Sequence, residues 1–119
     1  MFINLSNHIS EKWNSRQIEA AQKYGEIVDI MFPPVDPHST DQELDSLVED
    51  YYNKVMHYEN PVVMLQGEYV FTYRLIVRLK KAGIKVLASQ SERRTIEYID
   101  DNGFTARRSE FEFVKFMEY

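Results

Sequence analysis

The chain has 119 residues and no cysteine, and its 14 Lys and Arg against 19 Asp and Glu give a net charge of −5. This length suits one domain, and the missing cysteines exclude disulfides, thiolate metal sites and cysteine nucleophiles. The acidic balance argues against general binding of duplex nucleic acid, which needs a strong basic field. No secretion signal or membrane-length apolar segment stands out. We therefore expect a single domain over residues 1–119 that resides in the cytoplasm, without a membrane partner.

The first half of the chain alternates short apolar runs with helical patterns. Thr40 and Glu43 form a predicted capping box before a helix, and Pro33-Pro34 ends the preceding strand. Asn14 with Gln17 has the same capping form, and Gly25 ends that helix. We expect strands at Phe2–Ser6 and Glu26–Phe32 and helices at Ser15–Tyr24 and Leu44–Met56, the last with apolar residues at helical spacing.

The second half begins with the same alternation and then changes. A strand at Pro61–Gln66 precedes a helix at Glu68–Ala82, whose apolar residues cover most of its circumference. Such a helix is either largely buried or packed against a second subunit. A strand at Ile84–Ala88 and a polar loop at Ser89–Arg94 follow. An Asn-Gly turn then predicts a β-hairpin between strands at Thr95–Ile99 and Phe104–Phe116.

This order of elements predicts an α/β fold. Alternating strands and helices with apolar strands indicate a parallel sheet covered on both faces. With right-handed crossovers, the expected architecture is a Rossmann-like three-layer sandwich of four mainly parallel strands with a C-terminal antiparallel β-hairpin.

Ligands of such sheets bind beyond the carboxyl ends of the strands, so the loops there hold the candidate site. Asn7-His8 follows the first strand and offers an acid–base or hydrogen-bonding group, or it simply caps the next helix. Gln66-Gly67-Glu68 follows the third strand, where Glu68 either acts chemically or favours the helix dipole. Ser89–Arg94 brings hydroxyls beside two guanidinium groups, which suits phosphate unless it is only a charged surface turn.

Several familiar chemistries lack their motifs. The sequence contains no G-x-G-x-x-G after the first strand, no G-x-x-x-x-G-K-[ST] and no G-x-S-x-G. Its three histidines form no metal-binding pattern. We therefore expect no metal and no cofactor.

Three segments carry a resemblance to a known family. The strand ending in Ser6-Asn7-His8, the run V-V-M-L-Q-G-E and the run I-K-V-L-A-S-Q-S-E-R-R resemble the small stand-alone Rossmann-like proteins associated with type III CRISPR systems. These proteins are similar to CARF domains, the sensors of cyclic oligoadenylate. The resemblance covers nearly the whole chain, and we expect no second effector domain of the kind that the larger CARF proteins carry.

The resemblance implies a homodimer, or a higher homo-oligomer, that binds cyclic oligoadenylate, with the tetra-adenylate ring favoured. The protein would sequester the ligand or slowly cleave it as a metal-independent ring nuclease. Carried over by position, the ligand residues are Asn7, His8, Gln66, Gly67, Glu68, Ser89, Ser91 and Arg93. The candidates for a catalytic role among them are His8, Glu68 and Arg93.

Two alternatives stay open from the residues. One is an enzyme resembling nucleoside deoxyribosyltransferases or N-glycosidases, with Glu68 as its key carboxylate. The other is an interaction subunit without a ligand, in which the aromatic-rich helix 69–79 and a C-terminal set of aromatic residues form an oligomer interface. That set comprises Phe111, Phe113, Phe116 and Tyr119.

Overall fold

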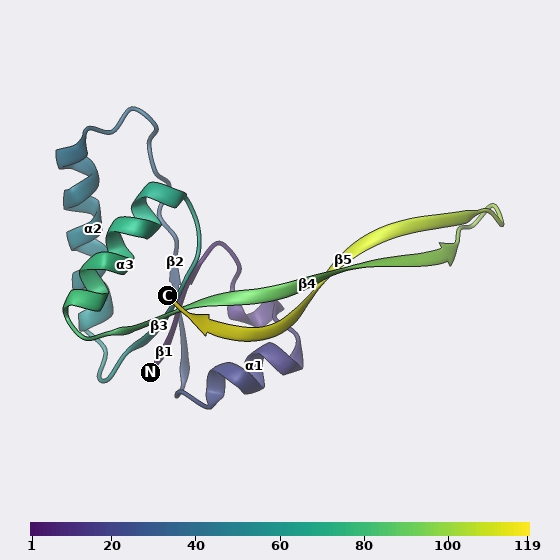
Figure 1. Ribbon diagram of the computed structural model, residues 1–119, viewed down its shortest axis with the longest axis horizontal. Coiled ribbons are helices and arrows are strands. Elements are labelled where there is room, and N and C mark those ends of the chain that lie inside the picture. The colour runs from purple at the N-terminus through teal and green to yellow at the C-terminus, as the bar shows by residue number, and fades with distance from the viewer.

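A single mixed sheet organises the computed structural model, which describes residues 1–119 (Figure 1). The strand order is β2-β1-β3-β4-β5. Strands β1 to β4 run parallel, and β5 is antiparallel to β4. This confirms the predicted α/β fold, with its mainly parallel strands and its C-terminal antiparallel hairpin. The strands are β1 (Phe2–Ser6), β2 (Ile27–Met31), β3 (Val62–Leu65), β4 (Lys85–Ile99) and β5 (Thr105–Glu118).

Helices cover both faces of the parallel part of the sheet. Helices α2 and α3 pack side by side on one face, and α1 lies on the other (Figure 1). The capping box of Thr40 and Glu43 is formed at the start of α2, as predicted, whereas Asn14 caps α1 without a reciprocal bond from Gln17. The helices are α1 (Ser15–Gln22), α2 (Asp41–Met56) and α3 (Tyr69–Lys81), preceded by a short 3-10 helix, η1 (Ser10–Lys12).

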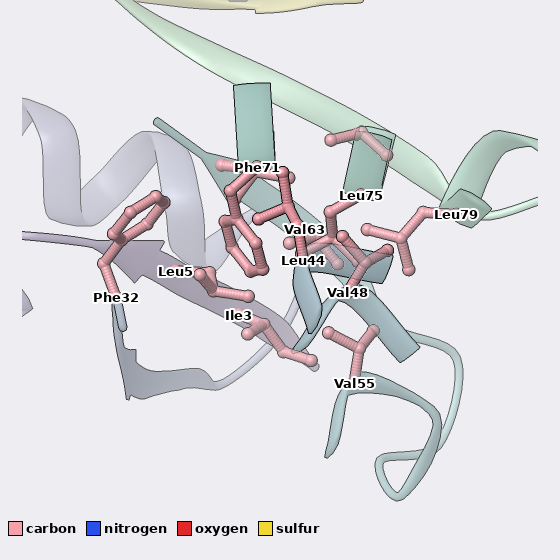
Figure 2. Close-up of a cluster of buried hydrophobic side chains, with 12 residues drawn as sticks. Ile3, Leu5, Phe32, Leu44, Val48, Val55, Val63, Phe71, Leu75 and Leu79 are labelled. Atoms are coloured by element: carbon pink, nitrogen blue, oxygen red, sulfur yellow. The ribbon is translucent and has the colours of Figure 1, made fainter. Parts of the chain in front are cut away.

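The larger hydrophobic core lies between the sheet and helices α2 and α3 (Figure 2). Ile3 and Leu5 of β1 face this core because alternate residues of a strand point to the same side. Phe71 of α3 lies at its centre, and its ring makes edge-on contacts with Phe32 and Tyr51 at centroid distances of 5.3 and 5.7 Å. This core therefore sets the position of α3 against the sheet.

A smaller core lies under α1 on the opposite face. It contains Phe2, Ala21, Met64 and Leu87, with Trp13 and Phe116 packed against it. The Phe2 and Phe116 rings are 5.1 Å apart, so the last strand is tied to the first. The polar residues Asn4 and Ser6 follow Phe2 at every second position of β1, so they point to the same α1 face as Phe2.

Ion pairs join the outer surfaces of α2 and α3. Arg74 binds both Asp41 and Asp45, and Arg78 binds Glu49 through two nitrogens at 3.0 and 3.1 Å. The hydrogen bond from Arg78 holds the pKa of the Glu49 carboxyl below its usual value. These exposed pairs add little stability, and the buried apolar residues of the larger core set which faces of the two helices meet.

The segment Ser89–Arg94 corrects the sequence prediction. We expected a loop there, whereas β4 continues unbroken from Lys85 to Ile99 and pairs with β5 as far as Ile99–Thr105, with one bulge at Gln90/Ser91. From Gln90 to Arg94 every residue of this strand is exposed, and the segment Ser89–Arg94 contains no apolar side chain. The pattern of this segment therefore indicated a polar loop and not a strand.

The two long strands form an arm that projects far from the body (Figure 1). This arm, residues 91–113, ends in the turn Asp100–Gly103, where Gly103 has a φ of 80°. Helix α3 is buried within the chain on one side only, because Tyr69, Val70 and Tyr73 are exposed, and packing against a second subunit stays a prediction. None of the helices has the length and apolar character needed to cross a membrane.

Candidate functional site

A cleft of about 730 Å³ opens at the carboxyl ends of β1 and β3, beside Ser89 and Ser91 in the middle of β4, on the α1 face of the sheet. The chain reverses its direction of travel across the sheet between β1 and β3, and this is where open α/β sheets bind ligands. The cleft is lined by Ser6, Asn7, His8, Lys12, Trp13, Asn14, Gln17, Met64, Gln66, Gly67, Ser89, Ser91, Phe111 and Phe113.

The chemistry of the cleft contrasts with the composition of the chain. No Asp or Glu lines it, although acidic residues outnumber basic ones by 19 to 14. Its polar groups are hydroxyls, carboxamides, the ammonium of Lys12 and the imidazole of His8, and its aromatic walls are Trp13, Phe111 and Phe113. No three His, Asp or Glu side chains of the protein cluster closely enough to hold a metal ion. This lining suits a ligand with hydrogen-bonding edges, flat rings and negative charge.

A buried polar network beneath the cleft holds the loop after β1. The Asn4 carboxamide is buried and donates to the His8 carbonyl and to Oδ1 of Asp29, both at 2.7 Å. Its oxygen accepts from the Ser6 hydroxyl at 2.7 Å, and that hydroxyl accepts from the His8 amide at 3.2 Å. Asp29 of β2 also accepts from the amide and hydroxyl of Ser10. Two neighbouring strands thus hold residues 6–10 in one conformation.

This network leaves the side chains of Asn7 and His8 free. Both residues are exposed and line the cleft, and neither ring nitrogen of His8 makes a hydrogen bond within the protein. Because the backbone of His8 is fixed while its imidazole is not engaged, His8 can exchange a proton or hydrogen-bond with a bound ligand. The structure thus places Asn7 and His8 in the lining of the cleft, and their role toward a ligand stays a prediction.

Gln66 extends the sheet where β3 ends. Its carboxamide donates to the Ser89 carbonyl at 3.2 Å and accepts from the Ser89 amide at 3.1 Å. The side chain thus replaces the backbone neighbour that β4 loses beyond Leu65. Gln66 positions the part of β4 from which Ser89 and Ser91 line the cleft.

Gly67 is required by packing as well as by its place in the cleft. A Cβ atom at this residue would lie 2.3 Å from the ring of Phe32, which packs into the larger core. An alanine there would force the aromatic ring to move, with a cost of about 1–3 kcal/mol. The absence of a side chain at residue 67 therefore has a structural cause independent of any ligand.

The carboxylate of Glu68 caps α3 rather than facing the cleft. Its oxygens accept from the backbone amides of Val70 at 3.0 Å and Phe71 at 2.8 Å. Glu68 is absent from the lining of the cleft. Among the two explanations offered by the sequence, the geometry favours the interaction with the start of the helix.

We predict that Glu68→Ala destabilises the protein without weakening ligand binding in the cleft. The lost cap should lower the free energy of unfolding by about 1 kcal/mol, measured by urea denaturation. Glu68→Asp is the matched control, because a shorter carboxylate still caps a helix. Loss of ligand affinity in both variants, at unchanged stability, would contradict the capping role and support a chemical one.

Arg93 lies outside the lining of the cleft, on the arm. It pairs across the strands with Phe111, so both side chains point to the face that continues the cleft. Its guanidinium contacts only the Ser109 hydroxyl, at 3.0 and 3.2 Å. Every other arginine of the chain has a carboxylate partner within 4.0 Å, and Arg93 has none. Of the eight predicted ligand residues, Glu68 and Arg93 are thus the two that do not line the cleft.

Sequence reasoning missed one wall of the cleft. Lys12, Trp13, Asn14 and Gln17 come from η1 and the start of α1, which fold back beside the end of β1. From the sequence we expected only Asn7 and His8 at the site after β1, and so the polar residues that follow them were left out. Phe111 and Phe113 come from β5, and from the sequence we considered them only as part of an oligomer interface.

No curated protein matches the sequence. A family model described as "Uncharacterized protein MJ1673 family" matches residues 1–117. Since this match spans nearly the whole chain, the protein belongs to the MJ1673 family.

Proposed function

We propose that the cleft binds a cyclic oligoadenylate, with the tetra-adenylate ring favoured, and that the protein sequesters or slowly cleaves this messenger of type III CRISPR antiviral signalling. The observation that carries the proposal is a large cleft without acidic side chains, at the switch point of the sheet, in a chain of net charge −5. The choice of cyclic oligoadenylate comes from the sequence resemblance to CARF-type proteins.

The lining supports a nucleotide ligand in two ways. Flat bases stack on aromatic side chains, with about 1–3 kcal/mol gained per base, and the cleft offers Trp13 and Phe111. The carboxamides of Asn7, Asn14 and Gln17 offer donors and acceptors to base edges and ribose hydroxyls.

Two cationic side chains near the cleft would bind the phosphates of the ligand. Lys12 lines it, and Arg93 extends from the adjoining face of the arm without a carboxylate partner. A cleft of about 730 Å³ is within the usual range for a small ligand, so one subunit would hold part of a ring. We therefore propose that two subunits share one ligand, which doubles the available cations.

Cleavage is the separable part of the proposal. A metal-independent ring nuclease needs the ribose 2′-hydroxyl in line with the scissile phosphate and stabilisation of the developing charge. The free imidazole of His8 is the candidate to take the 2′-hydroxyl proton, and Arg93 is the candidate to stabilise the phosphate. The alternative enzyme with Glu68 at its centre finds no support in a carboxylate that caps α3.

Calorimetric titration with cyclic tetra- and hexa-adenylate tests binding. We expect heat and saturation with at least one ring, and no heat with either would overturn the proposed function. Incubation with labelled ring then decides the fate of the ligand. Linear product that is lost in His8→Ala supports cleavage, whereas binding without product assigns sequestration.

For Arg93→Ala we expect ring affinity to fall about tenfold to a hundredfold, because a charge-assisted hydrogen bond contributes about 1.5–3 kcal/mol. Arg108→Ala is the matched control, since Arg108 lies on the other face of the arm and already pairs with Glu110. Calorimetry on both variants separates them. Equal affinity in the two variants would remove Arg93 from the site and leave the cleft itself in place.

A further inference from the structure

Two apolar surfaces of the molecule are left largely uncovered by the rest of the chain. The first, which we call the tip, comprises Tyr98, Ile99 and Phe104 at the end of the arm, and Ile99 and Phe104 are 74% and 70% exposed. The second, the α3 stripe, comprises Tyr69, Tyr73 and Val77, which recur every four residues on the outer side of α3. The side chains of Tyr69 and Tyr73 are 89% and 68% exposed. Exposed apolar patches of this kind mark interaction surfaces.

The tip and the α3 stripe cannot cover each other in one molecule. They lie toward opposite ends of the long dimension, which measures 55 Å (Figure 1). The strand from Ser91 to Ile99 carries the tip about 26 Å beyond the body, at roughly 3.3 Å per residue. A two-stranded hairpin alone in water is at best marginally stable. Beyond the sheet that anchors it, the arm has little stability of its own, and a contact with another molecule would stabilise it.

The charges beside the tip and beside the α3 stripe are of opposite sign. Along the middle of the arm the arginines are neutralised within the arm, as in the pairs Arg107–Glu97 and Arg108–Glu110. At the tip, Asp101 is exposed and has no ion-pair partner. At the C-terminal end of α3, next to the α3 stripe, Lys81 is likewise exposed and unpaired. An acidic apolar tip thus complements a basic apolar helix face.

We propose that the tip of one copy of this chain binds the α3 stripe of a second copy. In a twofold dimer the contact occurs twice, because residues that meet in one direction also meet in the other. Each contact would bury three aromatic side chains, Tyr69, Tyr73 and Phe104, together with Ile99 and Val77. At about 150–250 Å² per buried aromatic, two contacts reach the roughly 1,000 Å² that a specific interface requires.

This inference rests on the homodimer of the proposed function and names its surface, but its test is separate from ligand binding. Sedimentation velocity on the full chain, without ligand, should show a dimer. Phe104→Ser at the tip and Tyr73→Ser on the α3 stripe should each raise the dimer dissociation constant at least tenfold. Met31→Ser is the control, since Met31 is exposed on the edge strand β2, outside both surfaces.

Mixing the two variants gives the decisive result. In a mixed dimer the intact tip of Tyr73→Ser meets the intact α3 of Phe104→Ser, so one complete contact forms. We expect the mixture to dimerise more tightly than either variant alone. In the same way, Asp101→Lys and Lys81→Asp should each weaken the dimer and should restore it when combined in one chain.

Two outcomes would overturn the inference. One is a monomeric wild-type protein at all concentrations tested, and the other is a dimer that both serine variants leave unchanged. Circular dichroism of each variant excludes unfolding as the cause of a lost dimer. If the variants remain dimeric and still bind the ring in calorimetry, the interface lies elsewhere and the proposed function stands. If the tip contact holds and no ring binds, only the proposed function fails.

Discussion

Phe71→Ala should lower the free energy of unfolding by about 3–5 kcal/mol, the usual cost of deleting a buried aromatic ring. The Phe71 side chain is fully buried, and its ring packs edge-on against Phe32 and Tyr51. Its loss would leave a cavity between α3 and the sheet. The ring of Phe32, which packs over Gly67, would also lose its contact with Phe71. For a domain whose total stability is of order 5–15 kcal/mol, this loss is large.

Urea denaturation followed by circular dichroism measures the change. Met31→Ala is the control, because Met31 is 59% exposed on an edge strand and should shift stability by less than about 0.5 kcal/mol. If Phe71→Ala lost no more than the control, Phe71 would not be the centre of the larger core. The placement of α3 derived from that core would then be wrong.

Asn4→Ala should have the largest effect on the cleft itself. The buried carboxamide bonds to the His8 carbonyl, to Asp29 and to the Ser6 hydroxyl, so its removal takes one hydrogen bond from each of these three groups. Each lost hydrogen bond costs about 0.5–1.5 kcal/mol, and more at the charged carboxylate of Asp29. We expect lower stability and faster hydrogen exchange of the amides in residues 7–13. Affinity for the cyclic tetra-adenylate ring should fall at least tenfold.

Ser10→Ala is the matched control for Asn4→Ala. It removes one hydroxyl bond to Asp29 while the carboxamide network stays intact. Hydrogen-exchange mass spectrometry should show faster exchange in residues 7–13 of Asn4→Ala and little change in Ser10→Ala. Unchanged exchange in Asn4→Ala would show that the loop holds its conformation without the network, and Asn4 would lose its positioning role.

Local signals were sufficient for most of the fold. Capping residues and apolar periodicity located α2, and glycine or proline ended several elements close to their observed limits. The arm was the exception. Between Gln90 and Arg94 the strand has no buried residue, and it is held by pairing with residues of β5 more than fifteen positions away. No local pattern reports such a partner, so a strand there read as a loop.

The lining of the cleft was likewise predicted only in part, because part of it depends on contacts between segments far apart in the chain. The rule that ligands bind at the carboxyl ends of parallel strands located Asn7, His8, Gln66 and Ser89. This rule does not predict which of these side chains already form hydrogen bonds within the protein. The carboxylate of Glu68 is taken up by α3 and the carboxamide of Gln66 by β4, and these bonds depend on atoms brought together only by folding.

The sequence by itself determined the order of strands and helices, the α/β class and the loops that meet at one end of the sheet, because these follow from periodicity, caps and right-handed crossovers. Only the tertiary structure decided that η1 and β5 close the cleft, that Arg93 alone among the arginines lacks a carboxylate, and that the hairpin becomes a projecting arm. These features depend on contacts between segments far apart in the chain, where the free energy of packing and pairing, and not local preference, sets the outcome.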